Sequence, residues 1–249
     1  MEDKFIDVHA HLSDPSFTDR KKELFSMLKD SYLVLNAGEN SVQDRKILDE
    51  SRNLSFLLPC IGLHPNEIAR MAYEDAEKEL AYFSQNIADF FAVSEVGLDY
   101  RGKDTYQMEQ EKEFFYRILE LSEINKKVCI IHSRKAIEDV FDAVSGFKVK
   151  AILHNFEGNL RNLKKAEELG LYISVSTGFI RFKKDNVIKN IALDRLFTET
   201  DSPVLSPDSG INTPLNLPKL LNYISSIRNM GVNDLKSAVY NNFKRVFYD

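Results

Sequence analysis

The 249-residue sequence predicts an α/β fold, and more specifically a single (β/α)8 TIM barrel. Short apolar runs alternate with helix-like amphipathic segments eight times along the chain. These runs lack a regular alternation of polar and apolar residues, which is typical of parallel strands covered on both faces. Eight such units in a chain of about 250 residues favour a closed barrel, with an open doubly wound sheet as the alternative.

The first half of the chain supplies four of the expected strands. They are expected at Phe5–His11, Tyr32–Ala37, Phe56–Ile61 and Phe90–Val96. Apolar residues at helical spacing predict a helix over Phe17–Lys29, and Pro65–Ile87 is long enough for one helix or two. A charged segment, Val42–Arg52, separates the second strand from the third.

The second half repeats the pattern with four further strands. They are expected at Val128–Ile131, Val149–Leu153, Leu171–Val175 and Leu196–Glu199. Helices are predicted at Tyr106–Asn125, Ala136–Val144, Leu160–Leu169, Asn186–Ala192, Leu217–Arg228 and Val232–Phe247. No linker or low-complexity segment interrupts the alternation, so we expect residues 1–249 to form a single domain.

The composition is typical of a soluble globular protein, with 43% hydrophobic and 29% charged residues. A net charge of −5 argues against a protein held to nucleic acid or membrane mainly by overall charge, but it allows a local basic rim. Both cysteines, Cys60 and Cys129, lie in apolar runs and are expected to be buried hydrophobes. With no recognisable signal peptide and no long apolar stretch, we expect a cytoplasmic protein.

Three polar residues interrupt the first strand. Asp7, His9 and His11 are spaced at i, i+2 and i+4, so in a strand their side chains point to one face. A buried polar group without a partner costs about 1–3 kcal/mol, and three in succession therefore require a reason. Two imidazoles one strand period apart form a ready pair of metal ligands, whereas the alternative is a surface strand whose polar residues face water.

All five histidines fall at or just after the carboxyl end of an expected strand. They are His9 and His11 after the first strand, His64 after the third, His132 after the fifth and His154 after the sixth. In a parallel barrel the active site lies at this end of the strands. The sequence therefore predicts that the five imidazoles share one rim.

Two carboxylates join this rim. Glu95 interrupts the fourth strand, and Asp201 follows the eighth. Imidazoles and carboxylates together are suitable ligands for a pair of zinc, manganese or magnesium ions, and the absence of cysteine ligands disfavours a structural zinc site. Two ions about 3.5–4 Å apart need a bridging group, and Glu95, between the two groups of histidines, is the natural bridge.

Six motifs follow one another along the chain in order. They are Asp7-Val8-His9-Ala10-His11, Gly62-Leu63-His64-Pro65, Glu95-Val96-Gly97-Leu98-Asp99-Tyr100, Ile131-His132-Ser133-Arg134, His154-Asn155-Phe156-Glu157-Gly158 and Glu199-Thr200-Asp201-Ser202-Pro203. Together they resemble the TatD family of metal-dependent deoxyribonucleases, a branch of the amidohydrolase-like barrels. The resemblance covers nearly the whole chain. It implies hydrolysis of phosphodiester bonds in DNA, often as an exonuclease, with two divalent ions, magnesium or manganese.

The resemblance also implies a role for each matching residue. The implied metal ligands are His9, His11 and Asp201 for one ion, and His132 and His154 for the other, with Glu95 bridging both. Asp201 would also orient or deprotonate the attacking water. Three further residues are candidates for support or substrate binding. Asp7 could orient a ligand histidine, His64 could either bind a phosphate or cap the following helix, and Arg134 could hold a phosphate.

Two segments depart from the family pattern on the substrate side. Glu157 stands where the family usually has a small residue, and Ile211–Pro214 replaces the usual Arg-Asn-Glu-Pro. An alternative function is therefore the same two-metal barrel acting on a small phosphoester or an amide or ester. A non-catalytic partner protein is disfavoured because no implied ligand is missing. DNA is the expected partner, with no membrane and no obligate protein partner. A rim of basic residues would favour DNA, and the candidates are Arg101, Lys103, Arg134, Arg181, Lys183 and Lys184.

Overall fold

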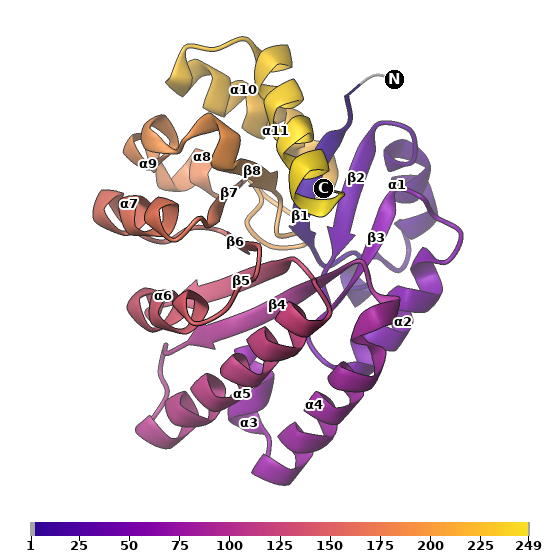
Figure 1. The fold of residues 1–249 in the computed structure, drawn as a ribbon. Coiled ribbons are helices and arrows are strands. Elements are labelled where there is room, and N and C mark those ends of the chain that lie inside the picture. The colour runs from indigo at the N-terminus through magenta and orange to yellow at the C-terminus, as the bar shows by residue number, and fades with distance from the viewer. Residues whose placement is uncertain (1–2, 249) are drawn as a thin grey trace.

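The computed structural model describes residues 3–248 and contains one eight-stranded parallel sheet in the order β1 to β8. The strands are β1 (Phe5–Ala10), β2 (Tyr32–Asn36), β3 (Leu57–Ile61), β4 (Ala92–Asp99), β5 (Cys129–Arg134), β6 (Ala151–Leu153), β7 (Tyr172–Ser176) and β8 (Leu196–Glu199). Each strand pairs in parallel with the next, and the strands curve into a nearly closed barrel with helices around it (Figure 1). The predicted barrel is confirmed.

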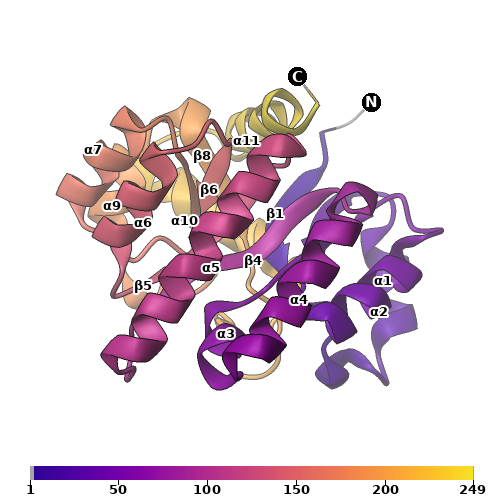
Figure 2. The same cartoon turned by 60° about the horizontal axis from the view of Figure 1, so that its bottom comes forward.

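The helices fill the connections between the strands and cover the outside of the barrel (Figures 1 and 2). They are α1 (Lys21–Leu28), α2 (Ser41–Ser51), α3 (Pro65–Arg70), α4 (Tyr73–Asn86), α5 (Thr105–Ile124), α6 (Ile137–Ser145), α7 (Leu160–Glu168), α8 (Phe179–Phe182), α9 (Asp185–Asn190), α10 (Leu217–Arg228) and α11 (Val232–Phe247). Short 3-10 turns lie at Pro15–Phe17, Ile87–Asp89, Leu193–Arg195 and Pro214–Asn216.

The structure adds two helices, α2 and α8, that the expected elements do not include. The charged segment between the second and third strands forms α2, because the Asn40 side chain accepts hydrogen bonds from the amides of Val42 and Gln43 at the helix start. The segment Pro65–Ile87, by contrast, forms two helices, α3 and α4, which is one of the two arrangements expected for it. The short helix α8 was not expected, since four residues are too few to show a helical period.

Several helix starts are encoded locally. The side chain of Asp104 caps the Gln107 amide at the start of α5, and the Gln107 side chain accepts in return from the Asp104 amide. Asn159 and Asn162 form the same reciprocal arrangement at the start of α7. Such capping boxes satisfy amides that the first turn of a helix leaves free, so they help set where each outer helix begins.

The barrel closes through contacts between the first and last strands and the residues that follow them. The His11 amide donates to the Ser202 carbonyl at 2.7 Å, and the Asp201 amide donates to the His9 carbonyl at 2.9 Å. Inside the seam, the Thr198 hydroxyl donates to the carbonyl of Ile6 at 2.6 Å. The closure therefore draws the residues after β8 onto the end of β1.

Apolar side chains from strands and helices form one continuous core on both sides of the sheet. Cys60 and Cys129 are both buried there as free thiols, as expected from their apolar surroundings. Among residues 3–248, none of the helices is both long and apolar enough to cross a membrane.

Two glycines allow the residues after β2 to meet the middle of β4 just past the end of β3. The Gly38 amide donates to the Ser94 carbonyl at 2.9 Å, and the Gly38 carbonyl accepts from the Glu95 amide at 2.7 Å. Gly62 lies beneath this contact, and a Cβ at Gly62 would stand 1.9 Å from the Gly38 oxygen. Asp44 completes the arrangement, because its Oδ1 accepts the Gly62 amide at 3.1 Å. The backbone of Glu95 thus depends on a position that has no room for a side chain.

We expect Gly62→Ala to lower the free energy of unfolding by about 3 kcal/mol, since overpacking forces the backbone apart. Denaturant-induced unfolding followed by circular dichroism measures this change. Gly146→Ala is the matched control, because the nearest atom to its added Cβ lies at an ordinary 3.5 Å. Equal stability of the two variants would contradict the close packing at Gly62.

The pH dependence of stability should depend on Asp44. Burial raises the pKa of its carboxyl well above the ordinary 3.8, against the hydrogen bond from Gly62. Above about pH 4 the unfolded state then loses this proton before the folded state does, so stability falls as pH rises. Asp44→Asn keeps the acceptor oxygen but cannot titrate. The unfolding free energy of Asp44→Asn should fall less steeply with pH than that of the wild type, and the two slopes should differ by up to about 1.4 kcal/mol per pH unit. Equal slopes would contradict the raised pKa of Asp44.

Candidate metal centre

A cavity of about 820 Å³ opens at the carboxyl ends of the strands. Its lining includes six of the seven residues expected to share this rim: His11, His64, Glu95, His132, His154 and Asp201. The seventh, His9, is fully buried beside them. The structure therefore brings together all five histidines and both carboxylates.

The carboxylate of Glu95 lies at the centre of this group and is almost completely buried. Its Oε2 is 3.4 Å from Nε2 of His9 and 3.5 Å from Nε2 of His11. Its Oε1 is 2.6 Å from Nδ1 of His132 and 2.9 Å from Nε2 of His154. Each oxygen of Glu95 thus faces a different pair of imidazoles.

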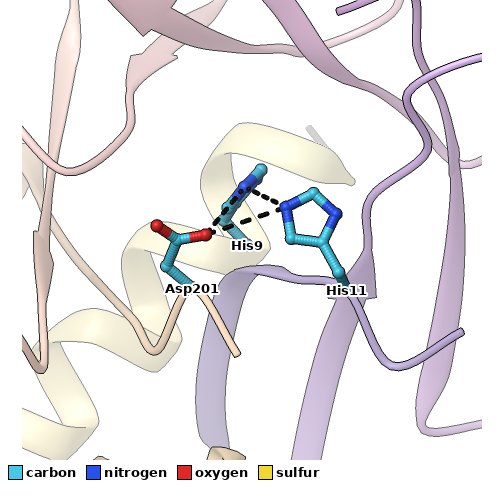
Figure 3. Close-up of side chains that lie close together, drawn as sticks. All are labelled: His9, His11 and Asp201. Carbon is cyan, nitrogen blue, oxygen red and sulfur yellow. Dashed lines mark hydrogen bonds and ion pairs between the residues drawn. The ribbon is translucent and has the colours of Figure 1, made fainter. Parts of the chain in front are cut away.

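The first pair of imidazoles is completed by Asp201 (Figure 3). The Nε2 atoms of His9 and His11 lie 3.1 Å apart, and Oδ1 of Asp201 is 3.5 Å and 3.7 Å from them. Two imidazole nitrogens bonded to one ion at about 2.0–2.1 Å are separated by roughly 3 Å. This cluster therefore has the ligand types and the spacing that a divalent cation requires.

The second pair shows the same spacing. Nδ1 of His132 lies 3.1 Å from Nε2 of His154, with Glu95 in reach of both. His64 approaches the same Glu95 oxygen, with its Nε2 at 3.5 Å. Three histidines and one carboxylate therefore surround a second position that suits a cation.

The electrostatics of the site reflect this crowding. Burial alone would raise the pKa of Glu95, but the surrounding histidines, His64 and His154 foremost, hold it well below its usual range. Burial lowers the pKa of His9, whereas Glu95 and Asp201 raise the pKa of His11 to about 9 against the effect of burial. A protonated imidazole balances the negative charge of these carboxylates. A divalent cation that displaced the proton would balance that charge in its place.

Two of the imidazoles hydrogen-bond a polar side chain through their far nitrogen. Ser94 Oγ is 3.0 Å from Nδ1 of His9, and Asp99 Oδ2 is 3.3 Å from Nε2 of His132. Such partners fix the tautomer and the orientation of an imidazole that binds a metal. Sequence reasoning did not assign Ser94 or Asp99, although both lie close to Glu95 along the chain and both are polar residues of a buried strand.

Glu199 lies behind His154, close to its ring but without a hydrogen bond to its Nδ1. Its Oε1 lies 3.5 Å from Nδ1 of His154 and accepts a hydrogen bond from the Asn155 amide at 2.7 Å. Glu199 is completely buried at the end of β8. A glutamate in the last position of an apolar strand was the sequence signal for this residue.

Asp7 turns away from the imidazoles. Its carboxylate accepts hydrogen bonds from the Thr200 amide at 2.9 Å and the Thr200 hydroxyl at 2.6 Å, and from the His9 amide at 3.3 Å. Burial raises the pKa of Asp7 to about 8 despite these bonds. Asp7 therefore ties the backbone before Asp201 to β1, instead of orienting a histidine ring.

Asp201 itself adopts a left-handed backbone conformation, with φ of 55°. This region is sparsely populated by residues other than glycine, although Asp tolerates it better than most. The turn follows directly after β8, and its amide is bonded to the His9 carbonyl. The bend places the Asp201 carboxylate beside the end of β1.

His64 and Arg134 occupy the wall of the cavity. Nδ1 of His64 accepts the Asn66 amide at 3.0 Å, so this histidine caps α3 while its Nε2 faces Glu95. Arg134 ends β5 and is half-buried. Both residues are therefore within the cavity, where each can contact a bound molecule.

The six basic residues expected on the rim have different surroundings. Of these, Arg134 lines the cavity, and Lys103 is bound to the buried carboxylate of Glu111. Lys184 donates to the Phe156 carbonyl at 3.0 Å, and Lys183 lies over the ring of Tyr223. The other two, Arg101 and Arg181, are exposed. The cations thus do not form a continuous lining of the cavity.

Comparisons with known proteins agree on one family. The model of the family described as TatD related DNase matches residues 6–248. An uncharacterized metal-dependent hydrolase of Buchnera aphidicola is 31% identical over 97% of this chain and 98% of its own length. The human deoxyribonuclease TATDN3 is 25% identical over 97% of this chain and 94% of its own.

A solved structure supports the same fold. The TatD homologue YJJV of Escherichia coli K12 superimposes with a TM-score of 0.89 at 23% identity, covering 98% of both chains. The family match spans the whole barrel, including every strand that contributes to the candidate metal centre. The chain therefore belongs to the TatD related DNase family of metal-dependent hydrolases.

Proposed function

We propose that this enzyme hydrolyses phosphodiester bonds of DNA, removing nucleotides from an end, with two divalent cations. The observation that carries the proposal is the position of Glu95, whose two oxygens face two separate pairs of imidazoles. A carboxylate can bridge two ions by presenting one oxygen to each of them. The human relative named a deoxyribonuclease supports DNA as the substrate.

The ligands that we propose for the two ions come from five strand ends. The first set is His9, His11 and Asp201, the second is His132 and His154, and Glu95 belongs to both. Magnesium or manganese suits a phosphodiester substrate, and zinc is the alternative that the imidazoles allow. When bound, such ions lower the pKa of water and neutralise charge on a phosphoryl group.

Asp201 is the residue that we propose moves the proton. Its Oδ1 faces the two imidazoles of β1, so its second oxygen is available to accept a proton from the attacking water. Its side chain is in contact with the cavity, whereas that of Asp7 is sealed in the barrel seam. Arg134 in the cavity wall is placed to donate two parallel hydrogen bonds to a phosphate.

The charge of the cavity wall favours a second candidate, a small phosphoester or an amide or ester. Asp14, Glu67 and Glu157 line the wall, and so does Glu39, whose Oε1 lies 3.9 Å from Nδ1 of His11. Arg70, also in the wall, is paired with Glu67 at 3.3 Å. A wall that is not strongly basic gives a long polyanion little electrostatic attraction. The binding of a small substrate would depend less on the charge of the cavity wall.

Cleavage of end-labelled single-stranded DNA separates the two candidates. The protein is stripped with a chelator, and magnesium, manganese or zinc is added back. Metal-dependent shortening of the labelled strand supports the nuclease, and the product ladder gives its polarity. Turnover of 4-nitrophenyl phosphate or 4-nitrophenyl acetate without any cleavage of DNA would instead support the second candidate.

We expect Glu95→Ala to lower kcat by about 10³-fold or more, because losing the bridge removes several kcal/mol of charge stabilisation. Titration calorimetry should show fewer than two bound ions, while circular dichroism shows a folded barrel. Glu157→Ala is the control for metal binding, since this exposed wall carboxylate contacts neither ion position and should leave two bound ions. Wild-type turnover by Glu95→Ala would refute the two-metal assignment.

Asp201→Asn keeps the size of the side chain and tolerates the left-handed turn, but it cannot accept the proton. We expect kcat to fall about 10²–10⁴-fold with KM changed much less. Steady-state kinetics at several pH values measure both constants. A variant that raised KM alone would show that Asp201 binds substrate and does not move the proton.

A further inference from the structure

Phe182 is a large apolar side chain that lines the cavity and yet remains 52% exposed. It is the last residue of α8, which follows β7 at the end of the barrel that carries the candidate metal centre (Figure 1). Its neighbour in α8, Phe179, is completely buried in the core. The two rings of this one-turn helix therefore lie in different surroundings. The Phe179 ring is in the core, whereas the Phe182 ring faces the cavity and solvent.

The backbone around Phe182 holds its ring in place. A Cβ at Gly178 would stand 3.0 Å from Cε2 of Phe182, so the ring lies directly over this glycine. The Phe182 amide donates to the Gly178 carbonyl at 3.0 Å, and Lys183 ends the helix in a left-handed conformation with φ of 53°. The ring is thus presented by a short rigid turn.

Gly178, beneath the Phe182 ring, also lies close to segments that lead to both proposed ion positions. The Gly178 Cβ position is 3.3 Å from Ser176 Oγ and 3.4 Å from Leu205 Cβ. Ser176 in turn donates to the side chain of Asn155, the residue after His154, at 2.8 Å. Leu205 belongs to the loop after Asp201 and also lines the cavity. Gly178, beneath the Phe182 ring, therefore lies beside Ser176 and Leu205, which connect to the residues after a ligand of each proposed ion.

The cavity that Phe182 lines carries a further exposed apolar side chain, and a cation lies beside the ring. Val204, which lines the cavity, is 55% exposed, and the guanidinium of Arg181 lies 5.5 Å from the Phe182 ring centroid. The floor of the cavity, by contrast, consists of imidazoles and carboxylates. An exposed aromatic ring beside a floor of polar side chains matches a nucleotide, whose base and phosphate differ in the same way.

We propose that Phe182 is a stacking platform for the nucleobase next to the phosphodiester that is cleaved. The inference rests on the proposed function, and it adds that the enzyme recognises the base of a terminal nucleotide by its flat face. Every base has such a face, so stacking on Phe182 confers affinity without strong sequence preference. Arg181 adds a cation beside the same ring.

Three variants test the platform. Phe182→Leu removes the aromatic face and keeps an apolar side chain, whereas Phe182→Trp keeps the face. Tyr106→Leu is the matched control, because Tyr106 is an exposed aromatic residue of α5 that does not line this cavity. The first measurement is KM and kcat of the metal-loaded enzyme on a thymidine oligonucleotide and on one whose terminal nucleotides carry a tetrahydrofuran in place of the base.

For the ordinary oligonucleotide we expect Phe182→Leu to raise KM about tenfold, with kcat nearly unchanged. Phe182→Trp and Tyr106→Leu should retain the wild-type KM. On the base-free oligonucleotide, Phe182→Leu and the wild type should have the same KM. Equal losses on both oligonucleotides would overturn the proposal, because the ring would then support the shape of the loop instead of binding a base.

A binding measurement gives the second readout. The probe is 2-aminopurine deoxyriboside 5′-monophosphate, which has no phosphodiester to hydrolyse and loses fluorescence on stacking. The wild type and Phe182→Trp should quench it, Phe182→Leu should bind it about tenfold more weakly, and 2-deoxyribose 5-phosphate should bind all three alike.

The two readouts separate failure of the platform from failure of the nuclease. If the wild type cleaves no DNA but quenching depends on Phe182, the proposed function is wrong and the platform stands. If DNA is cleaved and Phe182→Leu behaves like Tyr106→Leu in both measurements, the platform is wrong and the nuclease stands.

Discussion

A buried carboxylate surrounded by imidazoles is the constraint on which the site depends. Burying the charge of Glu95 is costly unless cationic or hydrogen-bonding partners surround it. The structure satisfies it with imidazoles on both oxygens, from strands that are far apart in the sequence. A fold that brings many strand ends to one place can do this. The parallel barrel, in which all carboxyl ends meet on one rim, meets that requirement.

Hydrogen bonds and close backbone contacts hold Glu95 and the proposed ligands in position. The glycines after β2 and β3 bring the Gly38 carbonyl to the Glu95 amide, and Asp7 holds the Thr200 backbone next to Asp201. Ser94 and Asp99 orient the rings of His9 and His132 through hydrogen bonds. A small shift of a ligand strongly weakens a metal site. Residues that contact no substrate therefore determine whether the proposed ligands stay at the right distance from an ion.

Most of the fold was predictable because its signals are local. Each strand is an apolar run and most helices have a clear period, so both can be recognised without knowing their neighbours. Two helices are exceptions, because one has few apolar residues and the other is very short. The segment Val42–Arg52 has few apolar residues and becomes α2 through the cap at Asn40 and the burial of Ile47. The four residues of α8 are too few for a period, and their placement depends on Gly178.

The sequence by itself determined the barrel and the set of residues that would meet, because every histidine follows an expected strand and parallel strands end on one rim. The tertiary structure decided how they meet. It showed that Nδ1 of His132, and not Nε2, faces Glu95, and that Asp7 binds the Thr200 backbone. It also placed Phe182 at the cavity mouth. These outcomes depend on side-chain packing between segments distant along the chain, which no local pattern of residues encodes.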